Sequence, residues 1–378
     1  MSMLLNEEQR LLRESAREFL AARAPVSALR KLRDSRDRLG YDPALWREVA
    51  AMGWTAAVFP EAEGGLDFGY KGLGAVFEQA GRSLAVMPLL SSVVLGGGLL
   101  LGAGNAGQRA LIADIISGDA LLALALEEQG RHAPAAVRTL ARREAGGWVL
   151  DGEKWMVLDG HVATLLVVVA RTTGVPGDSH GLSLFLVDPA AAGVEVHRTM
   201  MVDSRNAARV RLTGVKVDDS ALLGVADEGF APLDAVLDRA RICLAAEALG
   251  VIGEVFDRTI AYMKERVQFD VAIGSFQALQ HRVARLYAEI EMLRSCVVAA
   301  LGALDAGSPD VSLLASLAKA RASDLSERAL NEGVHLHGGI GVTDELDIGL
   351  FLKRGRVIQQ TFGDGVFHRN RYASLKGF

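Results

Sequence analysis

The chain has 378 residues, of which 50% are apolar, and its formal net charge is −5 at pH 7. This length predicts two or three subdomains around a sizeable core, because it exceeds that of most single domains. The mildly acidic balance argues against a nucleic-acid surface, which requires clustered Lys and Arg.

The first 120 residues predict a helical region. Apolar residues such as Leu12 and Phe19 recur among Glu and Arg, which predicts a helix over residues 5–23. Asp42-Pro43 predicts the start of a second helix, because proline suits the first helical turn. Further helices are expected at about 70–82, 86–103 and 107–116.

Residues 83–108 carry no charge and are long enough to span a bilayer. Pro88 and the Gly96-Gly97-Gly98 run weaken a membrane helix, so we expect a buried helix there. Residues 1–10 show no basic stretch followed by an apolar run, so no signal peptide is expected. These patterns predict a soluble protein of the cytoplasm that does not bind a membrane.

A β-rich region begins at Leu121, and from Gly229 the apolar period returns to that of a helix. Asp151-Gly152 lies between two strand-like runs and predicts a hairpin turn. The expected strands are 165–170, 182–187, 194–197 and 208–215, and the expected helices are 231–265, 274–306, 310–336 and 347–360. We therefore predict domains over residues 1–120, 121–225 and 226–378.

Common catalytic and metal motifs are absent from the sequence. His335 and His337 form an H-x-H pair without further ligands at suitable spacing, so no metal site is expected. Cys243 and Cys296 lie in apolar helical patterns, which predicts buried, reduced thiols. The glycine-rich run at 338–341 follows a helix, which leaves two compatible readings, a helix C-cap and a close approach of backbone to a phosphate or adenine.

Several short motifs in this order resemble the acyl-CoA dehydrogenase family over nearly the whole chain. The resemblance implies a mainly α fold with a central β-domain: an N-terminal helical domain, a β-barrel-like middle domain and a C-terminal four-helix bundle. The Ala245–Gly250 helix and the Phe362-Gly363-Asp364 ending resemble small subunits of heteromeric bacterial enzymes, of the pimeloyl-CoA and steroid side-chain dehydrogenase type. The motifs are Trp46 to Gly53, Pro60-Glu61-x-x-Gly64-Gly65, Leu124 to Glu128, Leu150 to Lys154, Glu265-Arg266-x-x-Phe269, Phe276-Gln277-x-x-Gln280-His281 and His337 to Gly341.

The resemblance implies α,β-desaturation of an acyl-CoA, with a carboxylate as base and FAD as hydride acceptor. In such enzymes FAD lies across a subunit interface, with its flavin ring on one subunit's β-domain and its adenine end on the other's helical domain. The adenine-side residues are kept here, although Arg266 as a solvated residue and Phe269 as core stay open as alternatives. The residues assigned to the adenine side are Arg266, Phe269, Gln277, His335, Gly338 and Gly339.

The flavin side and the base depart from the family. Glu127 to Pro134 replaces the usual Thr-Glu-Pro and Gly-Ser-Asp motifs, and Leu158 replaces the flavin-contacting threonine. The position of the catalytic glutamate falls on Phe362 or Gly363, and the alternative position falls on Ala240.

Asp364 and Arg241 are further candidates for the base and for a substrate contact. Asp364 is the nearest carboxylate, and the alternative to a base is a C-terminal capping role or an ion pair with Arg354 or His368. Arg241 is a candidate substrate contact. Glu247, six residues after Arg241, is predicted to point away from it and to be buried and paired.

These departures favour the small subunit of an α2β2 acyl-CoA dehydrogenase that shares one FAD with its partner. A complete homomeric enzyme using Asp364, and a non-enzymatic acyl-CoA-binding or assembly module, are the alternatives. Fatty acid or steroid catabolism is the expected setting, and the sequence does not identify the acyl group.

Overall fold

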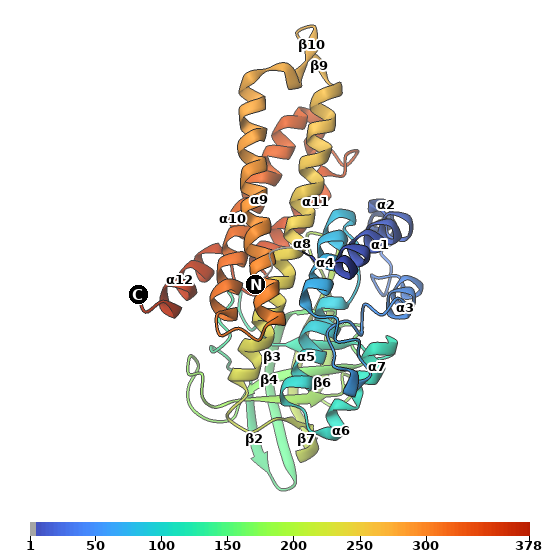
Figure 1. The fold of residues 1–378 in the computed structure, drawn as a ribbon. Coiled ribbons are helices and arrows are strands. Elements are labelled where there is room, and N and C mark those ends of the chain that lie inside the picture. Colours follow the sequence, from blue (N-terminus) through green and yellow to red (C-terminus); the bar gives the residue numbers. More distant parts are fainter. Residues whose placement is uncertain (1–4) are drawn as a thin grey trace. The chain divides into compact units, whose positions relative to one another are not determined.

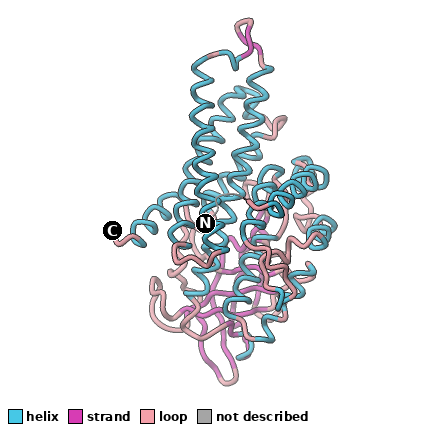
Figure 2. Tube along the Cα trace, in the orientation of Figure 1, coloured by secondary structure: helices cyan, strands magenta, loops and turns pink. Residues whose placement is uncertain are grey.

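The structure is a computed structural model that describes residues 5–378. A helical region, a β-region and a second helical region follow one another along the chain, as predicted (Figures 1 and 2). The expectation of no signal peptide rests partly on residues 1–4, which lie outside the described residues.

The N-terminal helices begin where their capping residues predict. Asn6 and Gln9 form a capping box at the start of α1, and the Asp42 side chain accepts from the Ala44 amide at the start of α3. The short helix α2 was not predicted, because nine residues give little periodic signal. The elements are α1 (Glu7–Arg23), α2 (Val26–Asp34), α3 (Pro43–Ala51), η1 (Glu61–Glu63), α4 (Tyr70–Ser83), η2 (Leu89–Gly97), α5 (Gly98–Ala103), α6 (Ala106–Arg109) and α7 (Leu111–Ser117).

The uncharged segment forms a buried helix, as predicted, and its first part, η2, is a π-helix. Two of its glycines permit close packing against neighbouring side chains. A Cβ at Gly96 would lie 2.3 Å from Leu122 Cβ, and one at Gly97 would lie 2.4 Å from Phe59 Cζ. In residues 5–378 no helix is long and apolar enough to cross a membrane.

The β-region forms an eight-stranded sheet in the order β6-β7-β3-β2-β4-β5-β8, with β1 paired to β4. The inward-facing apolar side chains form one core, in which Trp148 packs edge-on against Phe185. The strands are β1 (Leu122–Ala125), β2 (Leu140–Glu144), β3 (Gly147–Leu158), β4 (Leu165–Arg171), β5 (Leu182–Val187), β6 (Val194–Met200), β7 (Asn206–Asp218) and β8 (Leu222–Leu223), with η3 (Asp219–Ala221) before β8.

The predicted hairpin turn at Asp151-Gly152 is wrong. These residues lie inside β3, and the turn lies at 145–146, between β2 and β3. The pairing of β3 with β7 shifts register between Leu150 and Gly152. Gly152 has φ +156°, and a Cβ there would lie 2.4 Å from Thr139 Oγ1. The glycine therefore marks a bulge where the strand passes close to Thr139. The local sequence does not distinguish such a bulge from a turn.

Three long helices dominate the C-terminal region, close to the predicted ranges (Figure 1). The helix α12 was not predicted. A hairpin, β9 paired to β10, joins α8 to α9. The elements are α8 (Phe230–Glu265), β9 (Val267–Gln268), β10 (Val271–Ala272), η4 (Ile273–Ser275), α9 (Gln277–Asp305), α10 (Val311–His337), η5 (Gly338–Val342), α11 (Ile348–Gln360) and α12 (Gly365–Leu375).

The chain forms two compact units. The first contains residues 1–31, 70–85 and 241–378, and the second contains residues 32–69 and 86–240. The helix α8 contributes to both units. The predicted domain limits at residues 120 and 225 stay a prediction.

Candidate functional site

The predicted adenine-side residues lie on elements that meet at one end of the first unit. The Tyr262 ring, near the end of α8, stacks on the ring of His337 at the end of α10, with centroids 4.5 Å apart. Arg282, in the second turn of α9, bonds to His335 of α10. The β9–β10 hairpin joins α8 to α9 at the same end (Figure 1). Segments 75 residues apart in sequence are thus brought together.

Phe269 occupies the tip of the β9–β10 hairpin. It and Asp270 both have left-handed backbone angles, with φ +54° and +63°, which suit a two-residue type I′ turn. The Phe269 side chain is 87% exposed and makes an edge-on contact with Phe276, with centroids 6.2 Å apart. The alternative that Phe269 belongs to the core is therefore wrong. An exposed aromatic ring on a short hairpin is available for stacking against a planar group.

Arg266 and Gln277 lie at the two ends of the hairpin. Arg266 is exposed directly after α8, and Gln277 is the exposed first residue of α9. Phe276, the N-cap of α9, provides no side-chain hydrogen bond to the first turn. A helix N-terminus without a side-chain cap, near an arginine, favours an anion such as a phosphate.

Gly338 ends α10 with φ +67°, so the C-cap interpretation of the glycine run is confirmed. A Cβ built on Gly338 or Gly339 would meet nothing within 4 Å. Both glycines are exposed, so the backbone at this end of the unit is open to close approach from outside. The second interpretation, approach of a dinucleotide, stays a prediction.

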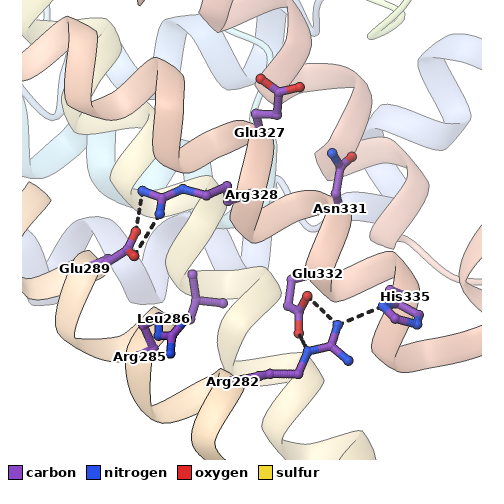
Figure 3. Close-up of a pocket in the computed structure, with 9 residues that line it drawn as sticks. All are labelled: Arg282, Arg285, Leu286, Glu289, Glu327, Arg328, Asn331, Glu332 and His335. Carbon is purple, nitrogen blue, oxygen red and sulfur yellow. Dashed lines mark hydrogen bonds and ion pairs between the residues drawn. The ribbon is translucent and has the colours of Figure 1, made fainter. Parts of the chain in front are cut away.

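His335 lines a polar cavity of about 580 Å³ between α9 and α10 (Figure 3). Arg282 Nη2 donates to Glu332 Oε2 at 2.6 Å and to His335 Nδ1 at 2.7 Å. Because arginine only donates, His335 Nδ1 must accept, which places the imidazole proton on Nε2. No sequence motif singles out Arg282 and Glu332, although the spacing of Glu332 and His335 places them on one helix face.

The adenine-side residues therefore fit the end of a dinucleotide. They provide a guanidinium group, an amide side chain, an uncapped helix N-terminus and an exposed aromatic ring. These groups complement a pyrophosphate and a purine.

The loop predicted for the flavin side, in the second unit, is closed by its own side chains. His132 Nδ1 donates to Glu127 Oε1 at 2.5 Å, and the His132 side chain is only 3% exposed. Glu128 accepts from the buried Lys154 Nζ at 2.7 Å and from Thr139 Oγ1 at 2.7 Å. Burial opposes ionisation of Glu128, but Lys154 and Thr139 together lower its pKa below the usual value. Two carboxylates here are unfavourable neighbours for a pyrophosphate.

The strand segment predicted to contact the flavin is irregular. The pairing of β3 with β7 shifts register between Lys154 and Val157. Within this bulge Met156 has φ +51°, and Trp155 and Met156 are 41% and 49% exposed. Leu158, where a hydroxyl is expected in the family, offers no hydrogen-bond donor. This side of the predicted site does not fit the flavin ring and its pyrophosphate.

The segment predicted to carry the base turns its backbone carbonyls toward buried donors. Lys319 Nζ donates to the carbonyls of Gln359 (3.1 Å) and Gly363 (2.8 Å). Arg241 Nε and His368 Nε2 both donate to the Phe362 carbonyl, at 3.3 Å and 3.1 Å. Sequence reasoning missed Lys319, because a lysine in a helix normally indicates a solvated face.

Glycine is required at position 363 of this segment. Gly363 has φ +108°, and a Cβ would lie 2.4 Å from Phe367 Cδ1 and 2.8 Å from His368 Nε2. Phe362 is 7% exposed and also has a left-handed backbone angle, with φ +55°. The backbone conformation and the neighbouring side chains at position 363 therefore require a residue without a Cβ atom.

Asp364 is the N-cap of α12, where its Oδ1 accepts from the Phe367 amide at 2.8 Å. The capping alternative for this residue therefore has a direct contact, while its role as base stays a prediction. Arg241 is fully buried, with its guanidinium 5.6 Å from the Phe367 ring centroid. A substrate contact by Arg241 also stays a prediction.

Glu247 is buried and paired, as predicted. Arg354 Nε and Nη2 donate to its two oxygens at 2.9 Å and 2.6 Å, and both residues are nearly inaccessible. Cys243 is a buried free thiol as expected, whereas Cys296 is only half-buried. Over residues 5–378, no group of three or more His, Cys, Asp or Glu is placed to hold a metal ion.

Comparison with known proteins gives consistent matches over the chain. Residues 6–119, 123–215 and 227–374 match the models of the N-terminal, middle and C-terminal domains of acyl-CoA dehydrogenase. The chain is 32% identical to acyl-CoA dehydrogenase IpdE2 of Mycobacterium tuberculosis, over 92% of this chain and 91% of that protein.

Solved structures give the same result. The chain is similar to a G363A variant of the Tcur3481–Tcur3483 steroid ACAD, with a TM-score of 0.88, 33% identity and 98% of each chain covered. It is also similar to the ChsE4–ChsE5 complex from Mycobacterium tuberculosis, with a TM-score of 0.89, 27% identity, and 100% of this chain and 99% of that chain covered.

Proposed function

This chain belongs to the acyl-CoA dehydrogenase family of flavin-dependent oxidoreductases, and from this we propose that it is the small subunit of a heteromeric enzyme. In this role it contributes the adenine-side half of a FAD site that it shares with a larger subunit. The larger subunit carries the flavin ring and the catalytic base. When bound, FAD supplies the hydride acceptor for α,β-desaturation of an acyl-CoA.

One contrast carries the proposal: the adenine-side residues are exposed and open, whereas the flavin-side loop is closed on itself. Arg266, Phe269 and Gln277 face solvent at the end of the first unit. Glu127 and His132 instead satisfy each other in the second unit. If the chain took no part in FAD binding, we would not expect one half of the site to stay open while the other half is closed.

The base position supports the same division of labour. A base must lie within hydrogen-bond reach of the α-proton, in a fixed geometry. Position 363 is a glycine whose backbone angle and neighbours leave no room for a glutamate side chain. The nearest carboxylate, Asp364, is engaged in capping α12. These observations favour a partner that supplies the base.

Two of the similar structures are described as pairs of proteins, Tcur3481–Tcur3483 and ChsE4–ChsE5. This supports a second, different subunit as the partner of this chain, for which we propose an α2β2 arrangement. The steroid description of one of them supports a bulky acyl-CoA of the steroid side-chain type as the substrate class.

The flavin stoichiometry tests the proposal. The chain is expressed alone and with candidate partners of the same family, and bound FAD is measured by its absorbance after desalting. We expect less than 0.1 FAD per chain alone and about one FAD per heterodimer, because the lone chain offers only one half of the site. Full loading and turnover of acyl-CoA by the lone chain would instead establish a complete homomeric enzyme.

A third possibility is a non-enzymatic acyl-CoA-binding or assembly module on the same fold. Titration of the lone chain with acyl-CoA in the absence of flavin distinguishes it. Binding without flavin, together with no FAD in any complex, would favour this module over a dehydrogenase subunit.

A further inference from the structure

Two adjoining cavities lie beside helix α1 in the first unit, away from every residue assigned above to the cofactor. Their volumes are about 260 Å³ and 380 Å³. Arg13, Glu78 and Arg294 line both of them, so the two cavities share a wall. Nothing in the proposed dehydrogenase function uses this region.

The smaller cavity has an apolar floor. Small residues of two helices, Ala75 of α4 and Ala246 of α8, lie opposite Val297 and Leu301 of α9. All four are buried, with exposures of 5% or less. Such a surface binds water poorly and accepts an apolar group.

The wall formed by α1 is cationic. Arg10, Arg13 and Arg17 follow one another at intervals of three and four residues, which places them on one face of the helix. Arg10 and Arg13 line the smaller cavity, and Arg13, Arg17 and one acidic residue of α1, Glu14, line the larger one, so arginines outnumber carboxylates on this wall.

These arginines lack the neutralising partners that other cations in the unit have. Glu78, which lines both cavities, accepts from Arg294 at 2.8 Å and is therefore already paired. Within the part of the chain that the structure describes, neither Arg13 nor Arg17 forms an ion pair. Unpaired arginines beside a dry apolar floor leave a local excess of positive charge.

We propose that these cavities bind an amphiphilic anion: a short acyl or alkyl chain on the floor of the smaller cavity, with a carboxylate or phosphate held by Arg13. The chemistry of the two cavities argues for this class, because the apolar floor suits the chain and the arginine fork suits a planar or tetrahedral anion. A ligand of this kind would contact none of the residues assigned to the cofactor.

Isothermal titration of the full chain with three probes of equal chain length tests the proposal: octanoate, octyl phosphate and octyltrimethylammonium. We expect the two anions to bind, with affinities that fall as salt is raised, and the cation not to bind. The ratio of octanoate to octyl phosphate affinity then distinguishes a carboxylate from a phosphate as the preferred head group. Equal binding of anions and cation, or no anion binding at millimolar concentration, would overturn the proposal.

Two variants locate the site, with a matched control. Arg13→Gln removes the central guanidinium and is expected to weaken octanoate binding about tenfold. Ala75→Leu fills the floor of the cavity and is expected to abolish binding while circular dichroism shows a folded chain. The control Lys31→Gln removes an exposed positive charge of the same unit that lines neither cavity, and it is expected to leave binding unchanged. Unchanged binding by Arg13→Gln would overturn the assignment, even if Ala75→Leu fails to fold.

Discussion

Three buried cations in this protein bond to backbone carbonyls. Lys319, Arg241 and Lys154 are all fully buried, and each donates to backbone carbonyls. A buried cation is costly unless it is fully hydrogen-bonded, so these residues stabilise the segments they hold. Two of them, Lys319 and Arg241, hold the segment in which the family places its base. The segment without a glutamate therefore has a backbone whose carbonyls are hydrogen-bonded to buried donors.

Lys319 predicts a dependence of stability on pH. Its burial, together with the nearby Arg241, lowers its pKa from 10.5 to about 7, although Asp364 opposes the shift. Between pH 7 and 10.5 the unfolded chain binds a proton that the folded chain releases, so stability rises with pH, and the gain is lost as pH falls through 7. We expect a gain of at most about 1.4 kcal/mol per pH unit from this residue.

Urea unfolding at pH 6.5, 7.5, 8.5 and 9.5 measures this contribution. The difference between the wild type and Lys319→Met should grow in favour of the wild type as pH rises above 7. Lys264→Met provides the control, because it makes the same substitution at an exposed lysine of the same unit. A parallel pH profile for Lys319→Met would contradict the prediction.

A pair of substitutions at Asp364 distinguishes a helix-capping role from a role as catalytic base. Asparagine can cap a helix but cannot act as a base, so Asp364→Asn should keep stability and flavin reduction by acyl-CoA in the assembled enzyme. Asp364→Ala removes the bond to the Phe367 amide and should cost about 1 kcal/mol of stability. Stopped-flow absorbance and urea unfolding give the two readouts. A loss of reduction by about 100-fold or more in Asp364→Asn would instead identify the residue as the base.

At the scale of elements, the β9–β10 hairpin is the clearest surface feature of the first unit. Two residues with left-handed angles form its turn, and an aromatic side chain at its tip faces solvent. Other apolar side chains near it are also exposed, including Val267 (55%) and Val342 (76%). An exposed apolar end of this kind is expected where another subunit covers it.

We expect a substitution at the hairpin tip to weaken FAD binding and to leave folding intact. Phe269→Ser should change the free energy of unfolding of the lone chain by less than about 0.5 kcal/mol, because the side chain is 87% exposed. The same change should lower the FAD retained by the complex with its partner.

Asp270→Gly is the matched control for this position. It relaxes a residue with φ +63° and should raise stability by about 0.5 kcal/mol without changing FAD content. Full FAD retention by the Phe269→Ser complex would show that the ring does not contact the cofactor.

The sequence predicted these elements unevenly, for physical reasons. Long helices such as α8 and α10 were close to their final bounds, because their period repeats over many turns. The turn at Asp151-Gly152 was wrong, because a glycine in a bulged strand and a glycine in a turn give the same local signal. The helix α12 was missed, since its start depends on the Asp364 cap after a glycine-rich segment.

At the scale of the whole molecule, the two halves proposed for the cofactor site lie in different units. The proposed adenine-side surface of the first unit is open, whereas the proposed flavin-side loop of the second is closed by the Glu127–His132 pair; the segment without a base also lies in the first unit. A division of this kind suits a protein whose cofactor is completed by a partner. It also explains how a member of a flavoenzyme family can keep the fold while its own base position holds no carboxylate.

The sequence by itself determined the family, the helical–β–helical order and the candidate adenine-side residues, because these depend on local periodicity and on motif order. It also indicated that Glu247 would be buried and paired. Only the tertiary structure decided which partners satisfy the buried groups: Arg354 for Glu247, and the carbonyls around Gly363 for Lys319. Those pairings join residues that are 107 and 44 positions apart, so no local pattern records them. The cationic cavities beside α1 have the same origin, since they exist only where separate helices pack against one another.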